Sequence, residues 1–205
     1  MRPLNRPIRS SQRGYSLVEL SIALAIIAVI VVGGLMGTRQ ILLSNNINNQ
    51  LKDSAQVLTK ITRQYQKQNV TTGATVATLA PLGTWPAERT TNTNGVWTVR
   101  GVIGGTSELV FSNTALLGSL PANQGLIYVL RNVPSAACAD IVNGLDPLAF
   151  AIYAGAAATA DPTTGATPTT TAVKVADAQA VNMANLAVGC SNANPLVDIA
   201  AVVKL

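Results

Sequence analysis

Histidine is absent from this 205-residue chain, and charged residues make up only 11% of it. Without histidine the sequence has no Ser-His-Asp triad, no Cys-His pair and no histidine-ligated zinc site. The nine acidic residues are scattered rather than paired at a spacing known for catalysis or metal binding. No glycine loop of a phosphate-binding type is present. The sequence therefore predicts a chain that is not an enzyme and that has no cofactor and no metal site.

Charge is missing altogether from residues 20–38, the apolar run LSIALAIIAVIVVGGLMGT that lies between Glu19 and Arg39. At about 1.5 Å per residue, a helix of this length spans about 28 Å, close to the hydrocarbon core of a bilayer. Four arginines precede the run within residues 1–14, and the positive-inside rule keeps that end in the cytoplasm. We expect a membrane-spanning helix with the rest of the chain on the far side.

The basic balance of the chain comes mostly from this N-terminal segment. The formal net charge is +5, with 14 basic and nine acidic residues. Removal of residues 1–14 takes away four basic and no acidic residues, so that 14 − 4 = 10 basic residues face nine acidic ones. A nearly neutral mature chain is not expected to bind nucleic acid strongly along its length.

Three kinds of processing compete at this terminus. A secretory signal peptide would be cut within the small residues at 32–34, although the apolar run is longer than usual for such a peptide. A lipoprotein requires a cysteine just after the run, and the first cysteine is Cys138, which excludes it. Cleavage between Gly14 and Tyr15 would keep the apolar helix and create an α-amine four residues before Glu19.

The basic leader ending in Gly14, the segment Tyr15-Ser16-Leu17-Val18-Glu19-Leu20 and the apolar run resemble the N-terminus of type IV pilins and their close relatives, the pseudopilins. The resemblance covers residues 1 to about 68. It implies that a prepilin peptidase removes residues 1–14 and methylates Tyr15, which stands where the family usually has phenylalanine. It also implies insertion in the inner membrane with a periplasmic head, followed by assembly into an extracellular homo-oligomeric filament by a pilus machinery.

Glu19 needs a partner if the apolar helices of a filament pack together, because an uncompensated charge there costs several kcal/mol. The resemblance implies that Glu19 pairs with the Tyr15 α-amine of a neighbouring copy. At about 4 Å and an effective dielectric near 20, the attraction is about 4 kcal/mol. Such a pair would also set the register between copies. The alternative is a carboxylate that marks the membrane boundary and snorkels to water.

Behind the apolar run, the helical pattern continues to about residue 68 with one apolar face. That face is predicted to contain Ile47, Leu51, Ala55, Leu58, Ile61 or Thr62, and Tyr65. The chain thus has one long helix over 15–68, of which 15–38 is the membrane or filament-core part, interrupted by Gly33, Gly34 and Gly37. The spacing of Gly33 and Gly37 suits close helix packing, and local loosening of the helix is the alternative.

Residues 69–205 are predicted to form an α+β head with an antiparallel sheet on the helix. Residues 69–95 are read as a connection. The expected strands are 96–103, 108–112, 126–132, 148–154 and 196–205, and the expected short helices are 135–143 and 177–188. Residues 154–172, rich in Ala, Thr and Pro, are expected to be an exposed loop that carries sugars, contacts a host surface or a phage, or does none of these.

Cys138 and Cys190 are the two cysteines, and both lie in the translocated part. An even pair in an oxidising compartment is most simply a disulfide that closes residues 138–190. In pilins such a C-terminal loop is commonly disulfide-closed, and the order of helix, cysteine and final strand is similar to the type IVb branch. The leading hypothesis is a pilus subunit for adhesion or twitching motility. Its rivals are a minor pilin or pseudopilin of a secretion or DNA-uptake machine, and a single-pass anchored binding domain that does not polymerise.

Overall fold

A computed structural model describes the chain in six segments, residues 16–68, 75–112, 124–156, 171–176, 179–191 and 193–204. The predicted leader, Gly14, Tyr15 and most of the predicted 154–172 loop lie outside these described residues. The chain divides into two compact units, Met1–Leu42 and Leu43–Leu205. We describe each unit by itself.

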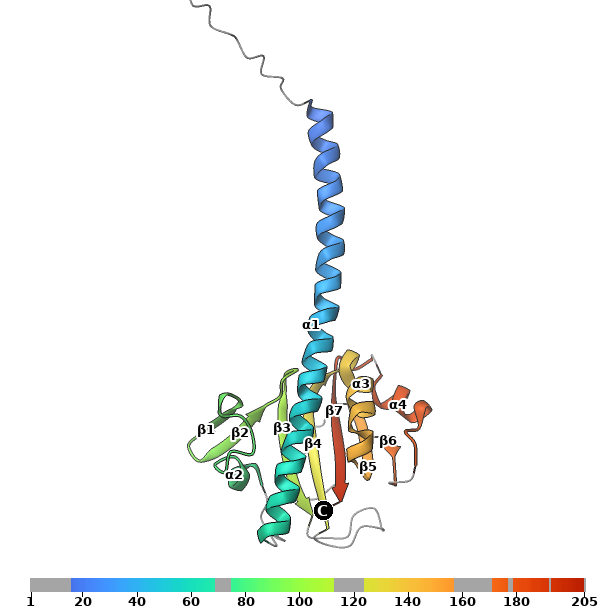
Figure 1. Ribbon diagram of the computed structural model, residues 1–205. Helices are drawn as coiled ribbons and strands as arrows, with labels where there is room; N and C mark the ends of the chain where they lie inside the picture. The colour runs from blue at the N-terminus through green and yellow to red at the C-terminus, as the bar shows by residue number, and fades with distance from the viewer. Residues whose placement is uncertain are drawn as a thin grey trace, which may run out of the picture. The chain divides into compact units, whose positions relative to one another are not determined.

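The first element is helix α1, Leu17–Gln68 (Figure 1). Its sequence contains no proline, the one residue that removes a helical hydrogen bond and clashes with the preceding turn. Gly33, Gly34 and Gly37 were expected to interrupt the helix, and this expectation was wrong. Three glycines cost about 1 kcal/mol each relative to alanine, but the backbone remains helical through all of them.

The second unit contains a seven-stranded antiparallel sheet with the strand order β1-β2-β3-β4-β7-β5-β6 (Figure 1). The strands are β1 Thr90–Thr93, β2 Val96–Arg100, β3 Thr106–Ser112, β4 Gly125–Pro134, β5 Ala151–Ala156, β6 Thr171–Lys174 and β7 Leu196–Lys204. The C-terminal strand β7 therefore lies in the middle of the sheet, between β4 and β5. The α+β prediction, with a long helix and an antiparallel sheet, is confirmed.

Short helices connect the strands of this unit. They are α2 Val76–Leu79, the 3-10 turn η1 Ala87–Arg89, α3 Ser135–Leu145, the 3-10 turn η2 Asp146–Leu148 and α4 Met183–Gly189. The α3 helix follows β4 directly, and its apolar residues Ile141, Val142 and Leu145 are buried. The predicted helix over 135–143 is thus found, two residues longer than expected.

Alternating side chains of the central strands form two buried clusters. Leu126, Tyr128 and Leu130 of β4 belong to the cluster that also contains the buried side chains of α1 and α3. Ile127 and Val129, one residue out of phase, belong to a second cluster on the opposite face of the sheet. Burial on both faces explains why β4 and β7 read as nearly continuous apolar runs.

The buried face of α1 is rotated from the predicted one. Ile47, Leu58 and Ile61 are buried as expected, whereas Leu51 and Ala55 are only half-buried. The positions that turn fully inward instead are Gln50, Ser54 and Val57. Two of these three are polar, so an apolar pattern alone assigns them to the wrong face.

The other errors of the sequence prediction concern weakly apolar segments. Residues 69–95 were read as a connection, but they contain α2, η1 and the edge strand β1. Residues 171–174 at the end of the predicted loop form the opposite edge strand β6, and residues 154–156 belong to β5. The helix expected from residue 177 begins only at Met183, where the Asn182 side chain accepts hydrogen bonds from the amides of Ala184 and Asn185.

Candidate functional site

The first half of α1 is apolar and exposed. Each large apolar side chain described between Leu17 and Leu42 is 52–85% exposed, on every face of the helix. This is the one helix of the described residues that is long and apolar enough to span a membrane, with a mean hydropathy of 2.6 over its most apolar 18 residues. A surface of this kind marks contact with lipid or with other protein.

Two hydroxyl groups in this half bond to their own helix. The Ser21 hydroxyl donates to the carbonyl of Val18 at 2.8 Å, and the Thr38 hydroxyl donates to the carbonyl of Leu35 at 3.0 Å. Such bonds to the preceding turn let a hydroxyl lie in an apolar medium. The carboxylate of Glu19 has no hydrogen-bond or ion-pair partner among the described residues. A partner for this charge has to come from outside the described chain.

The position of Glu19 in the helix favours its negative charge. It lies in the first turn of α1, which begins at Leu17. A negative charge near a helix N-terminus is favoured by the unpaired amides there. The predicted partner atom, the α-amine of Tyr15, lies outside the described residues together with Gly14. The pairing of Glu19 with Tyr15 therefore stays a prediction.

Gly33, Gly34 and Gly37 are not in close contact with any described residue outside their own helix. A methyl group added at Gly33, Gly34 or Gly37 would meet nothing within 4 Å. None of these glycines is therefore needed to make room for the described residues. Their small size is useful where a second helix approaches closely.

A polar seam holds the second half of α1 to the sheet within the second unit. The Gln50 amide donates to the Ser54 hydroxyl at 3.3 Å, and the Ser54 hydroxyl donates to the Tyr128 hydroxyl at 3.3 Å. Tyr128 in turn donates to the Ser107 hydroxyl at 3.4 Å. The Gln50 carbonyl oxygen accepts from the amide of Val102 at 2.7 Å. Burial raises the pKa of Tyr128, so the seam is neutral and fixes this half of the helix on strands β3 and β4.

Internal ion pairs involve four of the six described acidic residues of the second unit. Arg89 pairs with Asp53 of α1. Arg131 contacts Glu108 at 2.7 Å and Asp198 at 3.0 Å, and neighbouring Glu108 and Asp198 raise its pKa although burial opposes this. The remaining pair joins buried Lys174 to Asp146 at 2.9 Å. No group of three or more metal-ligating side chains is found in the part of the chain that the structure describes.

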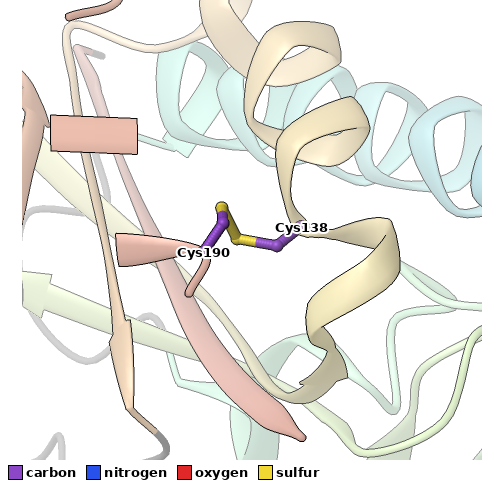
Figure 2. Close-up of a disulfide and its surroundings, with 2 residues drawn as sticks. All are labelled: Cys138 and Cys190. Atoms are coloured by element: carbon purple, nitrogen blue, oxygen red, sulfur yellow. A yellow bond between two sulfur atoms is a disulfide. The ribbon is translucent and has the colours of Figure 1, made fainter. Parts of the chain in front are cut away.

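The expected disulfide is present between Cys138 and Cys190, which are 52 residues apart in the sequence. Figure 2 shows that it joins α3, which carries Cys138, to Cys190 directly after α4. Cys138 is fully buried. A close approach beside it explains Gly189, because a methyl group there would lie 2.7 Å from the carbonyl oxygen of Ala154. The disulfide thus ties α4 and the edge strand β6 to the core.

Comparison with known proteins identifies the N-terminal segment. Residues 9–35 match the family model described as the prokaryotic N-terminal methylation motif. In this segment the chain is similar to type IV prepilins. No curated protein matches it. Among solved structures it is similar to TcpA, a type IV pilin from the Vibrio cholerae El Tor biotype, with 17% identity and a TM-score of 0.45, over 75% of this chain and 98% of that chain.

The motif spans the features that the structure singles out in this pilin-like chain. It includes Glu19, the uncharged apolar stretch from residue 20 to 35, and two of the three exposed glycines, Gly33 and Gly34. A prepilin motif followed by an exposed apolar helix fits membrane insertion and assembly into a pilus. Sequence reasoning found these residues, but it missed Gln50 and Ser54 of the polar seam because neither has an apolar side chain.

Proposed function

We propose that the chain is a structural subunit of a type IV pilus. It enters the inner membrane as a prepilin with residues 1–14 in the cytoplasm and the head in the periplasm. A prepilin peptidase cuts after Gly14 and methylates the new α-amine of Tyr15. The pilus assembly machinery then polymerises the mature chain into an extracellular filament that serves adhesion, motility or another surface interaction.

One observation carries this proposal. The first half of α1 exposes apolar side chains on all faces, and it contains a single unpartnered carboxylate, Glu19, in its first turn. The hydrocarbon core of a bilayer accommodates the apolar side chains but provides no cation for the carboxylate. A bundle of identical helices provides both, since each copy brings its own apolar surface and its own α-amine at Tyr15. The same surface supports insertion before assembly and burial after it.

The first test is the intact mass and the N-terminal sequence of protein sheared from cell surfaces. We expect a chain that begins at methylated Tyr15 and whose mass is two hydrogens short because of the disulfide. A chain that begins at Met1 would contradict processing and return the protein to the class of anchored binding domains. A chain that begins after Gly34 would indicate a secreted protein. The copy number in sheared filaments distinguishes a major subunit from a minor pilin or pseudopilin.

A further inference from the structure

The second half of α1 carries a row of exposed cations. Lys52, Lys60, Arg63 and Lys67, hereafter the basic stripe, are spaced by multiples of three and four residues, so they share one face of the helix. All four are exposed, and none of them takes part in an ion pair among the described residues. The one acidic residue of this half, Asp53, turns inward to Arg89. Nothing described on the chain therefore neutralises the basic stripe.

The surface beside the basic stripe is hollowed. A shallow depression of about 320 Å³ is lined by Ala55, Gln56, Thr59, Lys60 and Arg63. Lys60 is fixed at its rim because its ammonium group donates to the carbonyls of Gly83 at 3.0 Å and Thr84 at 3.3 Å. Two cations beside a depression lined by small and polar side chains suit a carboxylate.

The acidic residues left for such a contact are few. Four of the six described acidic residues of the second unit are held in internal ion pairs: Asp53, Glu108, Asp146 and Asp198. The other two, Glu88 and Asp140, are exposed and make no ion pair among the described residues. The near-neutral total charge thus hides a separation into one cationic stripe on α1 and two exposed acidic positions outside it, Glu88 of η1 and Asp140 of α3. Surfaces of opposite charge on one chain suit contact between two copies, each giving a different patch.

We infer that the basic stripe docks on an exposed acidic side chain of a second copy of this chain, Glu88 or Asp140, a contact that rests on the proposed filament. If Glu19 of one copy meets Tyr15 of the next, parallel helices are offset by four residues, about 6 Å. Glu88 adjoins Arg89, which is paired with Asp53. The offset brings Glu88 of the second copy level with residue 57 of the first, about 4.5 Å along the helix from Lys60.

Charge reversal tests the contact. The Lys60→Glu/Arg63→Glu variant is expected to be processed normally and to yield about tenfold fewer sheared filaments, because like charges would then face each other. The matched control is Arg100→Glu/Lys204→Glu, two exposed cations outside the basic stripe, which should assemble normally. Adding Glu88→Lys/Asp140→Lys to the reversed variant should restore the yield. Thermal unfolding of each variant shows whether a lower yield reflects misfolding.

A measurement on the wild-type protein tests the contact without any substitution that could disturb folding. Carbodiimide treatment of wild-type filaments should join Glu88 or Asp140 to a lysine of the basic stripe. The Glu19→Ala variant, which we expect not to assemble, should lack the product. Absence of such a crosslink, or a normal yield from the reversed variant, would overturn the inference. If that variant assembles normally but its filaments lose binding to double-stranded DNA, the occupant is nucleic acid instead. Wild-type protein that forms no filament would refute the proposed function itself.

Discussion

Glu19 lies among apolar side chains in the first turn of α1 and has no partner in the described chain. Removing one member of a buried ion pair costs about 3 to 5 kcal/mol, because the other charge stays buried alone. We therefore predict that Glu19→Ala and the isosteric Glu19→Gln are cleaved and methylated normally but form almost no filaments. Mass spectrometry and filament yield from sheared cells measure the two steps separately.

Ser21→Ala is the control for this prediction, because it removes a hydroxyl that already bonds to its own helix. It should leave the yield unchanged. Normal filament yield from Glu19→Gln would show that the carboxylate only marks the membrane boundary.

Tyr128 gives a prediction about alkaline pH. Its pKa is raised from the ordinary value of 10.0, chiefly by burial. The unfolded chain therefore loses this proton at a lower pH than the folded chain, and the free energy of unfolding falls as the pH rises above about 10. Tyr128→Phe should cost about 1 to 2 kcal/mol near neutral pH, since Ser54 and Ser107 lose a partner. The difference between wild type and variant should shrink in urea unfolding series from pH 8 to 11.

Tyr153 is the comparison for that experiment, because burial also raises its pKa while no hydrogen bond contributes to the shift. Tyr153→Phe should therefore remove part of the alkaline loss without the cost near neutral pH. A difference between Tyr128→Phe and wild type that stays constant over the whole series would contradict a role of its ionisation.

The sequence predicts the role of a residue when the role depends on that residue and its neighbours in the chain. Glu19 stands out because a carboxylate beside an apolar run is rare, and the cysteines because only two are present. Gln50 and Ser54 were missed because their burial depends on Tyr128 and Val102, which are far away in the sequence. A buried polar pair looks identical to a solvated one until its partners are known.

At the scale of elements, Gly33 and Gly37 lie one helical turn apart on α1, whereas Gly34 points about 100° away from Gly33. Because no described residue is near any of them, larger side chains should not disturb the chain itself. We predict that Gly33→Leu or Gly37→Leu lowers filament yield about tenfold through overpacking between copies. Gly34→Leu is the matched control and should have a smaller effect. Equal effects at all three positions would favour loosening of the helix over close packing.

The disulfide links two elements that otherwise meet through few side chains. In the loop-entropy model, closing a loop of this length stabilises the fold by about 4 kcal/mol. Cys138→Ala/Cys190→Ala should lose about that much in urea unfolding, and hydrogen exchange should rise first in α4. Ser191→Ala, next to Cys190, is the control and should change neither measurement. Equal loss of protection in β4 and in α4 would show that the bridge supports the whole sheet rather than α4.

The helices and strands with a strong apolar pattern were predicted correctly, and those with a weak pattern were missed. The central strands β4 and β7 and helix α3 were found because both faces of these strands and one side of this helix are buried. Strand β1, with the sequence TTNT, lies at the sheet edge and buries almost nothing. Strand β6 was missed because it is short and follows an Ala- and Thr-rich segment. Edge strands are defined by pairing with a neighbour, which the sequence does not display.

At the scale of the whole molecule, the distribution of charge says more about possible binding partners than the net charge does. The full chain has a net charge of +5, and four of its cations lie in residues 1–14. Internal ion pairs occupy most described acidic residues of the second unit, which leaves the basic stripe of α1 exposed. The expectation that nucleic acid does not bind along the chain was drawn from the sum alone. Contact with nucleic acid depends on local clusters of cations such as the basic stripe, which the sum does not show.

Processing should change the net charge of the whole molecule in a way that isoelectric focusing resolves. The uncut chain has a sequence pI of about 9.6, whereas cleavage after Gly14 leaves 14 − 4 = 10 basic residues against nine acidic ones. Methylation keeps the α-amine protonated, so it does not reverse this change. We predict that cell-surface protein focuses at a clearly lower pH than the uncut chain, although still on the basic side because no histidine titrates near neutrality. Gly14→Leu, which should block cleavage, should focus near the pI of the uncut chain. Ser11→Ala, a change within the leader, should be cut normally. Focusing of wild-type surface protein at the same pH as Gly14→Leu would show that the four leader arginines remain, and with them a chain anchored by its leader rather than released into a filament.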